Sequence, residues 1–328
     1  MAVLITGGAG YIGSHTVAEF MAQGEEVIVL DNLQKGHRDA VLAKIFYQGD
    51  IRDAELLDKV FSSHDIEAVV HFAADSLVGE SVQIPLQYYD NNLITAQRLL
   101  VGMEKHGVKK IVFSSTAATY GEPKSIPILE TDLKEPTNPY GETKLAIENM
   151  LKWCGQAYGI SSVALRYFNA AGAHQEGHIG EDHRPESHLI PIILQVALGQ
   201  RESLAIFGDD YPTPDGTCVR DYIHVTDLAM AHYLSLEKLR KTSNSSVYNL
   251  GNGEGFSVRQ VVDKAREVTG HAIPIQVAPR RAGDPAVLIA SSAKALAELG
   301  WKPQFNRLEQ IIQTAWNWHQ HHPKGFLK

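Results

Sequence analysis

The chain has 328 residues, of which 44% are hydrophobic, and a formal net charge of −8 at pH 7. This length predicts about two domains with a sizeable buried core, and the negative charge argues against a nucleic-acid-binding surface. The two cysteines, Cys154 and Cys218, lie far apart, which predicts a reduced intracellular setting without a disulfide framework or a cysteine-based metal site.

The first predicted element is a short buried strand at residues 2–6. Three glycines follow it at intervals of three residues and precede an apolar helix. In such a pattern the first glycine permits a tight turn, the second lets the backbone approach a pyrophosphate, and the third allows close helix–sheet packing, with the phosphates over the helix N-terminus. The spacing predicts a dinucleotide-binding loop formed by Gly7, Gly10, Tyr11, Ile12 and Gly13.

The second predicted strand, residues 26–30, ends in Asp31 and Asn32. A carboxylate at this place hydrogen-bonds the adenosine ribose hydroxyls and repels a 2′-phosphate, so Asp31 favours NAD over NADP. Three basic residues just after the strand could instead hold a 2′-phosphate, and they keep NADP open as the alternative. They are Lys35, His37 and Arg38.

Further strands are predicted at residues 67–71 and 110–114, with a helix at residues 91–105 between them. This alternation predicts an α/β fold with a Rossmann-type, doubly wound parallel sheet. Ligands of such sheets bind beyond the carboxyl ends of the strands. No run of about 18 apolar residues predicts a membrane span, and the first residues do not resemble a targeting segment, so we expect a cytoplasmic protein.

A helix that begins after the proline-containing segment 135–139 carries Tyr140 and Lys144. Residues four apart on a helix stand on one face, one turn from each other. A fixed positive charge about 4–6 Å from a phenol favours the phenolate and lowers its pKa from about 10 toward neutral pH. The pair therefore predicts a general base that takes a proton from an alcohol.

After a strand at residues 161–167 the chain changes to glycine-, histidine- and proline-containing loops. We expect an NAD-binding Rossmann domain at 1–170, to which about 218–256 return, and a smaller mixed α/β substrate-binding domain at 171–217 and 257–328. The spacing of Ser257 and Gln260 predicts a capping box. No metal site is expected at His319, His321 and His322, because no carboxylate or cysteine cluster accompanies them.

Several further segments carry a family resemblance over nearly the whole chain: residues 50–51, 71–74, 113–121, 166–169, 205–208 and 216–224. Together with the glycine loop and the Tyr140/Lys144 pair, they resemble the extended short-chain dehydrogenase/reductases, and among these the UDP-glucose 4-epimerases. The resemblance implies that Thr116 lies beside Tyr140 and assists it. It also implies a second set of NAD-contacting residues, namely Asp50, Ile51, Phe72, Ala73, Ala74, Ser76, Asn91 and Phe168.

The same resemblance implies a UDP-sugar substrate and assigns a set of residues to it: Asn169, His188, Leu189, Phe207, Arg220, Arg281 and Asp284. Two positions depart from the commonest pattern of the family. Ser76 stands where many relatives have lysine, and His188 stands where many have asparagine. Leu288 replaces a tyrosine of many glucose- and galactose-specific relatives, so acceptance of N-acetylated sugars stays open.

The implied activity is the interconversion of UDP-glucose and UDP-galactose through a transient 4-keto sugar with enzyme-bound NAD, in a homodimer. Related dehydratases carry an Asp-Glu pair after the active-site hydroxyl residue, whereas Ala117 and Ala118 follow Thr116 here, which argues against dehydration. The alternatives are another NAD-dependent nucleotide-sugar epimerase, including a UDP-N-acetylhexosamine 4-epimerase, a decarboxylase or a reductase, and a non-catalytic NAD sensor.

Overall fold

A computed structural model describes residues 1–281 and 284–326. A seven-stranded sheet, parallel throughout, forms its larger part, in the order β11-β6-β5-β4-β1-β2-β3. The strands are β1 (Ala2–Thr6), β2 (Glu26–Asp31), β3 (Ile45–Gln48), β4 (Ile66–His71), β5 (Lys110–Thr116), β6 (Ser161–Tyr167) and β11 (Ser246–Leu250). The strand order reverses between β1 and β4, which is where such sheets bind ligands. The predicted doubly wound fold is confirmed.

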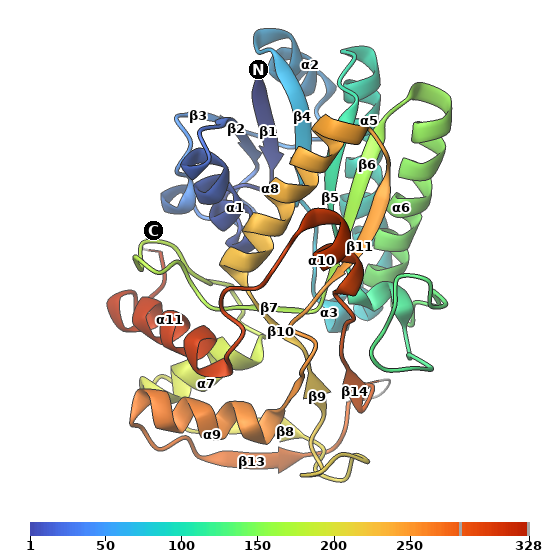
Figure 1. The fold of residues 1–328 in the computed structure, drawn as a ribbon. Helices are drawn as coiled ribbons and strands as arrows, with labels where there is room; N and C mark the ends of the chain where they lie inside the picture. Colours follow the sequence, from blue (N-terminus) through green and yellow to red (C-terminus); the bar gives the residue numbers. More distant parts are fainter. Residues whose placement is uncertain (282–283, 327–328) are drawn as a thin grey trace.

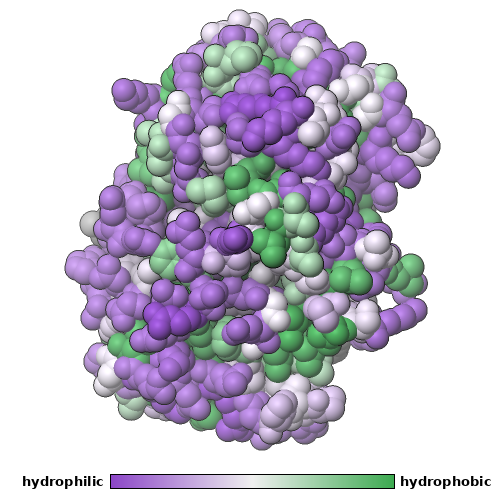
Figure 2. Space-filling view, in the orientation of Figure 1, coloured by the Kyte–Doolittle hydropathy of each residue, from purple (hydrophilic) through white to green (hydrophobic). Residues whose placement is uncertain are grey.

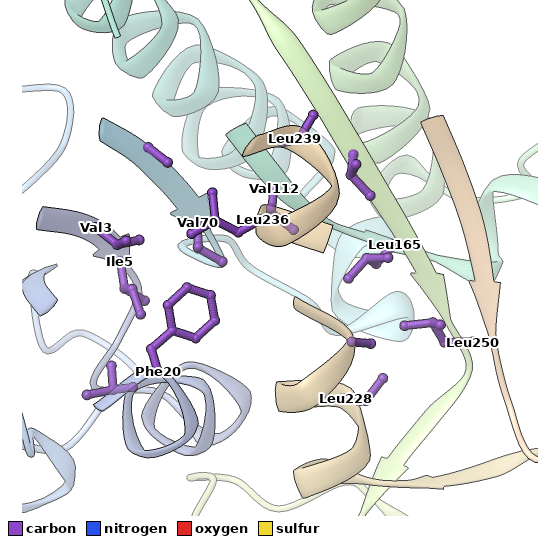
Figure 3. Packing of buried hydrophobic residues seen from close by; sticks show 14 of the residues in the cluster. Val3, Ile5, Phe20, Val70, Val112, Leu165, Leu228, Leu236, Leu239 and Leu250 are labelled. Carbon is purple, nitrogen blue, oxygen red and sulfur yellow. The ribbon is translucent and has the colours of Figure 1, made fainter. Parts of the chain in front are cut away.

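Helices cover both faces of this sheet because alternate residues of its buried strands point to opposite sides. Val3 and Ile5 of β1 pack with Phe20 on one face (Figure 3), whereas Leu4 packs on the other. The first face is covered by α1 (Tyr11–Ala22), α8 (Val225–Thr242) and α10 (Ala293–Leu299). The second is covered by α2 (Ala54–Ser63), α5 (Thr95–Lys105) and α6 (Pro139–Tyr158).

The strands and helices predicted for the first 170 residues are present, and the structure adds elements that were not predicted, among them helix α2. The short edge strand β3 was not predicted, and its residues are only partly buried or exposed, so they lack a continuous apolar run. The helix expected at residues 91–105 begins as a π-helical segment, Tyr89–Ile94, before α5. Short elements connect the others: α3 (Val78–Gln83), α4 (Pro85–Tyr88) and the 3₁₀ turns Arg38–Ala40 and Ala117–Tyr120.

A smaller mixed α/β part lies beyond the carboxyl ends of the strands (Figure 1). Its strands are β7 (Asn169–Ala171) with β10 (Tyr222–His224), β8 (Leu204–Phe207) with β13 (Ile275–Ala278), and β9 (Val219–Arg220) between β12 (Phe256–Ser257) and β14 (Val287–Leu288). Its helices α7 (Leu189–Ala197), α9 (Val258–Thr269) and α11 (Leu308–His321) share a separate apolar core. The capping box predicted at Ser257 and Gln260 is confirmed at the start of α9.

The apolar core of the large sheet also takes in residues from late in the chain. Ala295 of α10 and the fully buried Trp301 pack there, within the segment 257–328 that was expected to belong to the smaller domain. Hydrophilic side chains cover most of the face shown in Figure 2, and hydrophobic ones reach the surface mainly in its middle and lower right. Among the described residues, none of the helices combines the length and the apolar character needed to cross a bilayer.

Candidate active site

The glycine loop joins β1 to α1 with backbone contacts that leave no room for side chains. A Cβ atom on Gly13 would lie 2.1 Å from the carbonyl oxygen of Gly7, and a Cβ on Gly7 would lie 2.6 Å from the backbone nitrogen of Ala73. Helix α1 follows the N-cap residue Gly10, which supplies no side-chain cap, and its first turn contains no acidic residue. Its amide groups and its dipole therefore suit a pyrophosphate, so these residues fit NAD.

Asp31, at the end of β2, fixes the loop against this helix start. Its Oδ2 accepts from the backbone N–H of Ala9 (3.0 Å) and its Oδ1 from that of Leu33 (2.8 Å). Burial raises the pKa of the carboxyl group, while these two backbone donors favour its charged form. Each oxygen keeps a further lone pair that can accept from a ribose hydroxyl.

His37 and Arg38, two of the three basic residues considered as ligands of an NADP 2′-phosphate, contact other parts of the protein. The Nε2 atom of His37 lies 2.9 Å from the carbonyl oxygen of Asp182, and the guanidinium of Arg38 lies 4.5 Å from the ring centre of Phe46. The preference for NAD therefore rests on Asp31 at the end of β2.

Most of the remaining predicted cofactor residues follow the ends of β2, β3 and β4, whereas Asn91 lies in the π-helical segment Tyr89–Ile94 and Phe168 follows β6. Asp50 is bound by Arg52, whose Nε and backbone N–H donate to it at 3.0 and 2.8 Å, and this contact lowers the pKa of Asp50. Phe72 and Ala73 donate their backbone N–H groups to Thr6, beside the glycine loop. Among the others, Asn32 and Ser76 are exposed, Ile51 is buried, and Ala74, Asn91 and Phe168 are partly buried.

Tyr140 and Lys144 lie on the buried side of α6, with Thr116 at the end of β5. Tyr140 and Thr116 are each 9% exposed and Lys144 is 3% exposed. The ammonium of Lys144 donates to the carbonyl oxygen of Ser114 (2.9 Å) and lies 5.9 Å from the ring centre of Tyr140. Strand β5 and helix α6 thus bring the three predicted catalytic residues together, and Ser114 is a partner that sequence reasoning missed.

The pKa of Tyr140 differs from the expectation drawn from its spacing to Lys144. Burial raises the pKa of Tyr140, and the neighbouring hydroxyl of Thr116 lowers it. Burial also lowers the pKa of Lys144 to about 7. Desolvation disfavours both charged forms, and this cost cannot be read from a helical spacing.

Five of the predicted substrate residues lie on the short strands of the smaller part or beside them. The guanidinium of Arg281 lies 4.0 Å from the ring centre of Phe207, and Arg220 forms an ion pair with Asp284. Asn169 joins this region, because its backbone N–H donates to the carbonyl oxygen of Asp221 (3.0 Å). A phenyl ring and two guanidinium groups suit a nucleotide base and a diphosphate.

His188 and Leu189 lie apart from those five residues, at the start of α7. The Nδ1 atom of His188 is 2.8 Å from Oε1 of Glu181 and 3.1 Å from Oε1 of Glu186. Sequence reasoning missed these two glutamates and the adjacent His183, although alternating Glu and His side chains between residues 181 and 188 are a visible signal.

The chain matches known proteins over most or all of its length. A family model described as the NAD dependent epimerase/dehydratase family matches residues 3–251. A relative from Halalkalibacterium halodurans named UDP-glucose 4-epimerase is 65% identical over 326 residues, which cover 99% of this chain and 98% of that protein. A crystal structure of a UDP-glucose 4-epimerase is 58% identical, has a TM-score of 0.98 and is matched over 100% of both chains.

A further crystal structure was solved with ligands. The UDP-glucose 4-epimerase from Bifidobacterium longum, in complex with NAD⁺ and UDP, is 42% identical, with a TM-score of 0.95, and the match covers 99% of this chain and 100% of that one. The family and the NAD dependence expected from the sequence are confirmed. This chain belongs to the UDP-glucose 4-epimerases of the NAD-dependent epimerase/dehydratase family.

Proposed function

We propose that the protein interconverts UDP-glucose and UDP-galactose by inverting the configuration at C4 of the sugar. The observation that carries this proposal is the burial of Tyr140 and Lys144 one helical turn apart, with Thr116 facing Tyr140. Bound at the glycine loop, NAD would supply the reversible hydride acceptor for C4. The reaction has no net redox change, so the protein should retain its NAD between turnovers.

The side chains of this chain then handle the proton and the substrate. The phenolate of Tyr140 takes the proton of the C4 hydroxyl and later gives it back, while Thr116 hydrogen-bonds the same oxygen. Phe207, Arg220 and Arg281 hold the UDP group. Because UDP provides most of the contacts, the hexose can turn about its link to the diphosphate and present its other face.

Replacing Tyr140 with phenylalanine tests this assignment. Tyr140→Phe should lower the turnover of UDP-galactose by about 10²–10⁴-fold, which is the usual contribution of a general acid–base, and should leave bound NAD and UDP affinity nearly unchanged. Tyr158→Phe is the matched control, because Tyr158 is 51% exposed on the same helix. Full turnover by Tyr140→Phe would remove the phenol from the mechanism.

The preferred sugar is a second question at the same site. Leu288 of β14 pairs with Arg220 of β9, so its side chain adjoins the proposed UDP-binding group. Leucine is smaller than the tyrosine of many relatives limited to glucose and galactose, and acceptance of UDP-N-acetylhexosamines stays open. Incubation with UDP-galactose, UDP-N-acetylgalactosamine and UDP-glucuronate, without added cofactor, separates these activities from a decarboxylase or a reductase.

Different segments of the chain are assigned to the binding of NAD and of the UDP-sugar. We assign NAD binding to residues 1–170 with 218–256, and UDP-sugar binding to residues 171–217 and 257–328. The separate core around α7, α9 and α11 supports this division, whereas α10 and Trp301 within 257–328 pack in the core of the large sheet. Cysteine usage supports a cytoplasmic location.

We further propose that two copies of the chain associate through α5 and α6, which pack side by side. Val101 on α5 is 56% exposed and Trp153 on α6 is 65% exposed, and burying such apolar side chains favours association. Light scattering should give twice the mass of one chain for the wild type and for Val277→Glu, a control in β13. Trp153→Glu should shift the mass toward one chain, and an unchanged mass would exclude this surface.

A further inference from the structure

Two glutamates and two histidines converge in the segment before α7. They are Glu181, His183, Glu186 and His188, here called the loop cluster. Each offers one ligand atom, and these atoms all lie within 4.8 Å of one another. We propose that the loop cluster binds one Zn²⁺ ion that fixes this segment against the NAD-binding helix α1.

The distances within the loop cluster fit a common ion. The Nδ1 atom of His183 is 3.2 Å from Oε1 of Glu181 and 3.7 Å from Oε2 of Glu186. The Nδ1 atom of His188 is 2.8 Å from Oε1 of Glu181 and 3.1 Å from Oε1 of Glu186. Ligands about 2.0–2.2 Å from a tetrahedral Zn²⁺ lie roughly 3.4 Å from one another. The observed separations bracket that value.

His183 provides an independent indication. Its Nδ1 atom is buried and has no hydrogen-bond partner among the described residues, although both carboxylates lie close to it. The Nδ1 atom lies 3.2 Å from Oε1 of Glu181 and 3.7 Å from Oε2 of Glu186 without forming a hydrogen bond to either. An ion between these side chains would supply the partner that this buried nitrogen lacks.

The surroundings of the loop cluster hold its ligands in place. The backbone N–H groups of Ser187 and His188 both donate to Oε1 of Glu186 at 2.8 Å, and Glu181 is only 4% exposed. Such outer hydrogen bonds orient metal ligands. Two imidazoles favour Zn²⁺ over Mg²⁺ or Ca²⁺, which prefer oxygen ligands, and four protein ligands are typical of a structural rather than a catalytic zinc site.

The position of the loop cluster gives the ion a role. The ring of His183 lies 6.1 Å from that of Tyr11, at the start of α1. The Tyr11 hydroxyl donates to the carbonyl oxygen of Gly172 (2.6 Å). An ion here would tie the segment between β7 and α7 to the helix start that faces the NAD phosphates. The proposed Zn²⁺ site is independent of the reaction proposed for Tyr140.

Metal content of the intact, untagged protein tests the proposal. After zinc loading and desalting, mass spectrometry should find about one Zn²⁺ per chain, as expected for a structural site. His183→Ala and the conservative Glu186→Gln should lose it. The control is His178→Ala, which alters the neighbouring, more exposed group of His174, Glu176 and His178 and should keep one ion.

A second readout separates loss of zinc from loss of the fold. Added Zn²⁺ should raise the melting temperature of the metal-free wild type but not of Glu186→Gln, while bound NAD and circular dichroism report that the variant is folded. A wild type that takes up no stoichiometric zinc, or equal zinc in Glu186→Gln, would overturn the proposal. Turnover of UDP-galactose, measured separately, keeps this result distinct from the proposed function.

Discussion

At the scale of the residue, the environment of Tyr140 and Lys144 matters as much as their spacing. Both side chains are buried, and burial alone raises the pKa of the phenol and lowers that of the ammonium to about 7. Lys144 is held by the carbonyl oxygen of Ser114 and lies 5.0 Å from the ring centre of Phe113. These contacts fix the ammonium next to Tyr140, so its charge acts at a constant distance.

Removing the Lys144 charge should therefore impair the base. We expect Lys144→Met to lower turnover of UDP-galactose by about 10²-fold or more, because the phenolate loses its nearby positive charge. Lys152→Met is the matched control, since Lys152 is exposed on the same helix. Steady-state kinetics measure the turnover, and a parallel melting curve shows whether the variant is folded. Wild-type turnover in a folded Lys144→Met protein would show that the charge is not needed.

At the scale of the element, the turn between β1 and α1 allows almost no variation. Its backbone is packed so closely that the Cβ of an added side chain at Gly13 would overlap the Gly7 carbonyl group. This carbonyl also accepts from the backbone N–H of Gly10 (3.2 Å). The turn and the start of α1 therefore have to shift if Gly7 or Gly13 gains a side chain.

Gly13→Ala should separate α1 from β1 and abolish NAD retention. We expect the purified variant to release little or no NAD on denaturation, whereas Gly79→Ala should match the wild type, because a Cβ at Gly79 would meet no atom within 4 Å. Nucleotide released per chain, measured by chromatography, is the readout. Undiminished NAD in Gly13→Ala would mean that the loop is more tolerant than its contacts indicate.

At the scale of the whole molecule, the described part of the chain holds several buried, neutral histidines. His15, His71 and His224 have pKa values lowered to about 3 by burial, and His232 to about 4. In the unfolded chain each would titrate near 6.5. Unfolding therefore takes up protons below pH 6.5, and stability present above that pH is lost as the pH falls toward the folded-state values.

This linkage predicts acid sensitivity that a single substitution reduces. Between pH 7 and 5.5 each such histidine should cost about 1 kcal/mol of the free energy of unfolding. His232→Leu should lose about 1 kcal/mol less than the wild type over this interval, because it no longer carries this titrating imidazole. The exposed His271→Leu should behave as the wild type does. Urea unfolding at the two pH values measures the difference, and identical losses in His232→Leu and the wild type would contradict it.

The sequence by itself determined the features that depend on local geometry. Regular glycine spacing after a strand predicts the dinucleotide loop, and the interval between Tyr140 and Lys144 places both on one helical face, because neighbouring residues obey the repeat of the backbone. The capping box at Ser257 and Gln260 was predictable for the same reason, because these two residues are only three positions apart. Family resemblance added Thr116 and the UDP-binding residues, whose roles stay predictions.

Only the tertiary structure decided how buried these groups are and which distant residues meet. The pairing of Arg220 with Asp284, the carbonyl of Ser114 under Lys144, and the loop cluster beside Tyr11 all join parts of the chain that no local pattern connects. Packing also set the direction of the Tyr140 and Lys144 pKa shifts. The physical reason is that desolvation and long-range contacts depend on which surfaces the fold brings together, whereas spacing along one helix or turn does not.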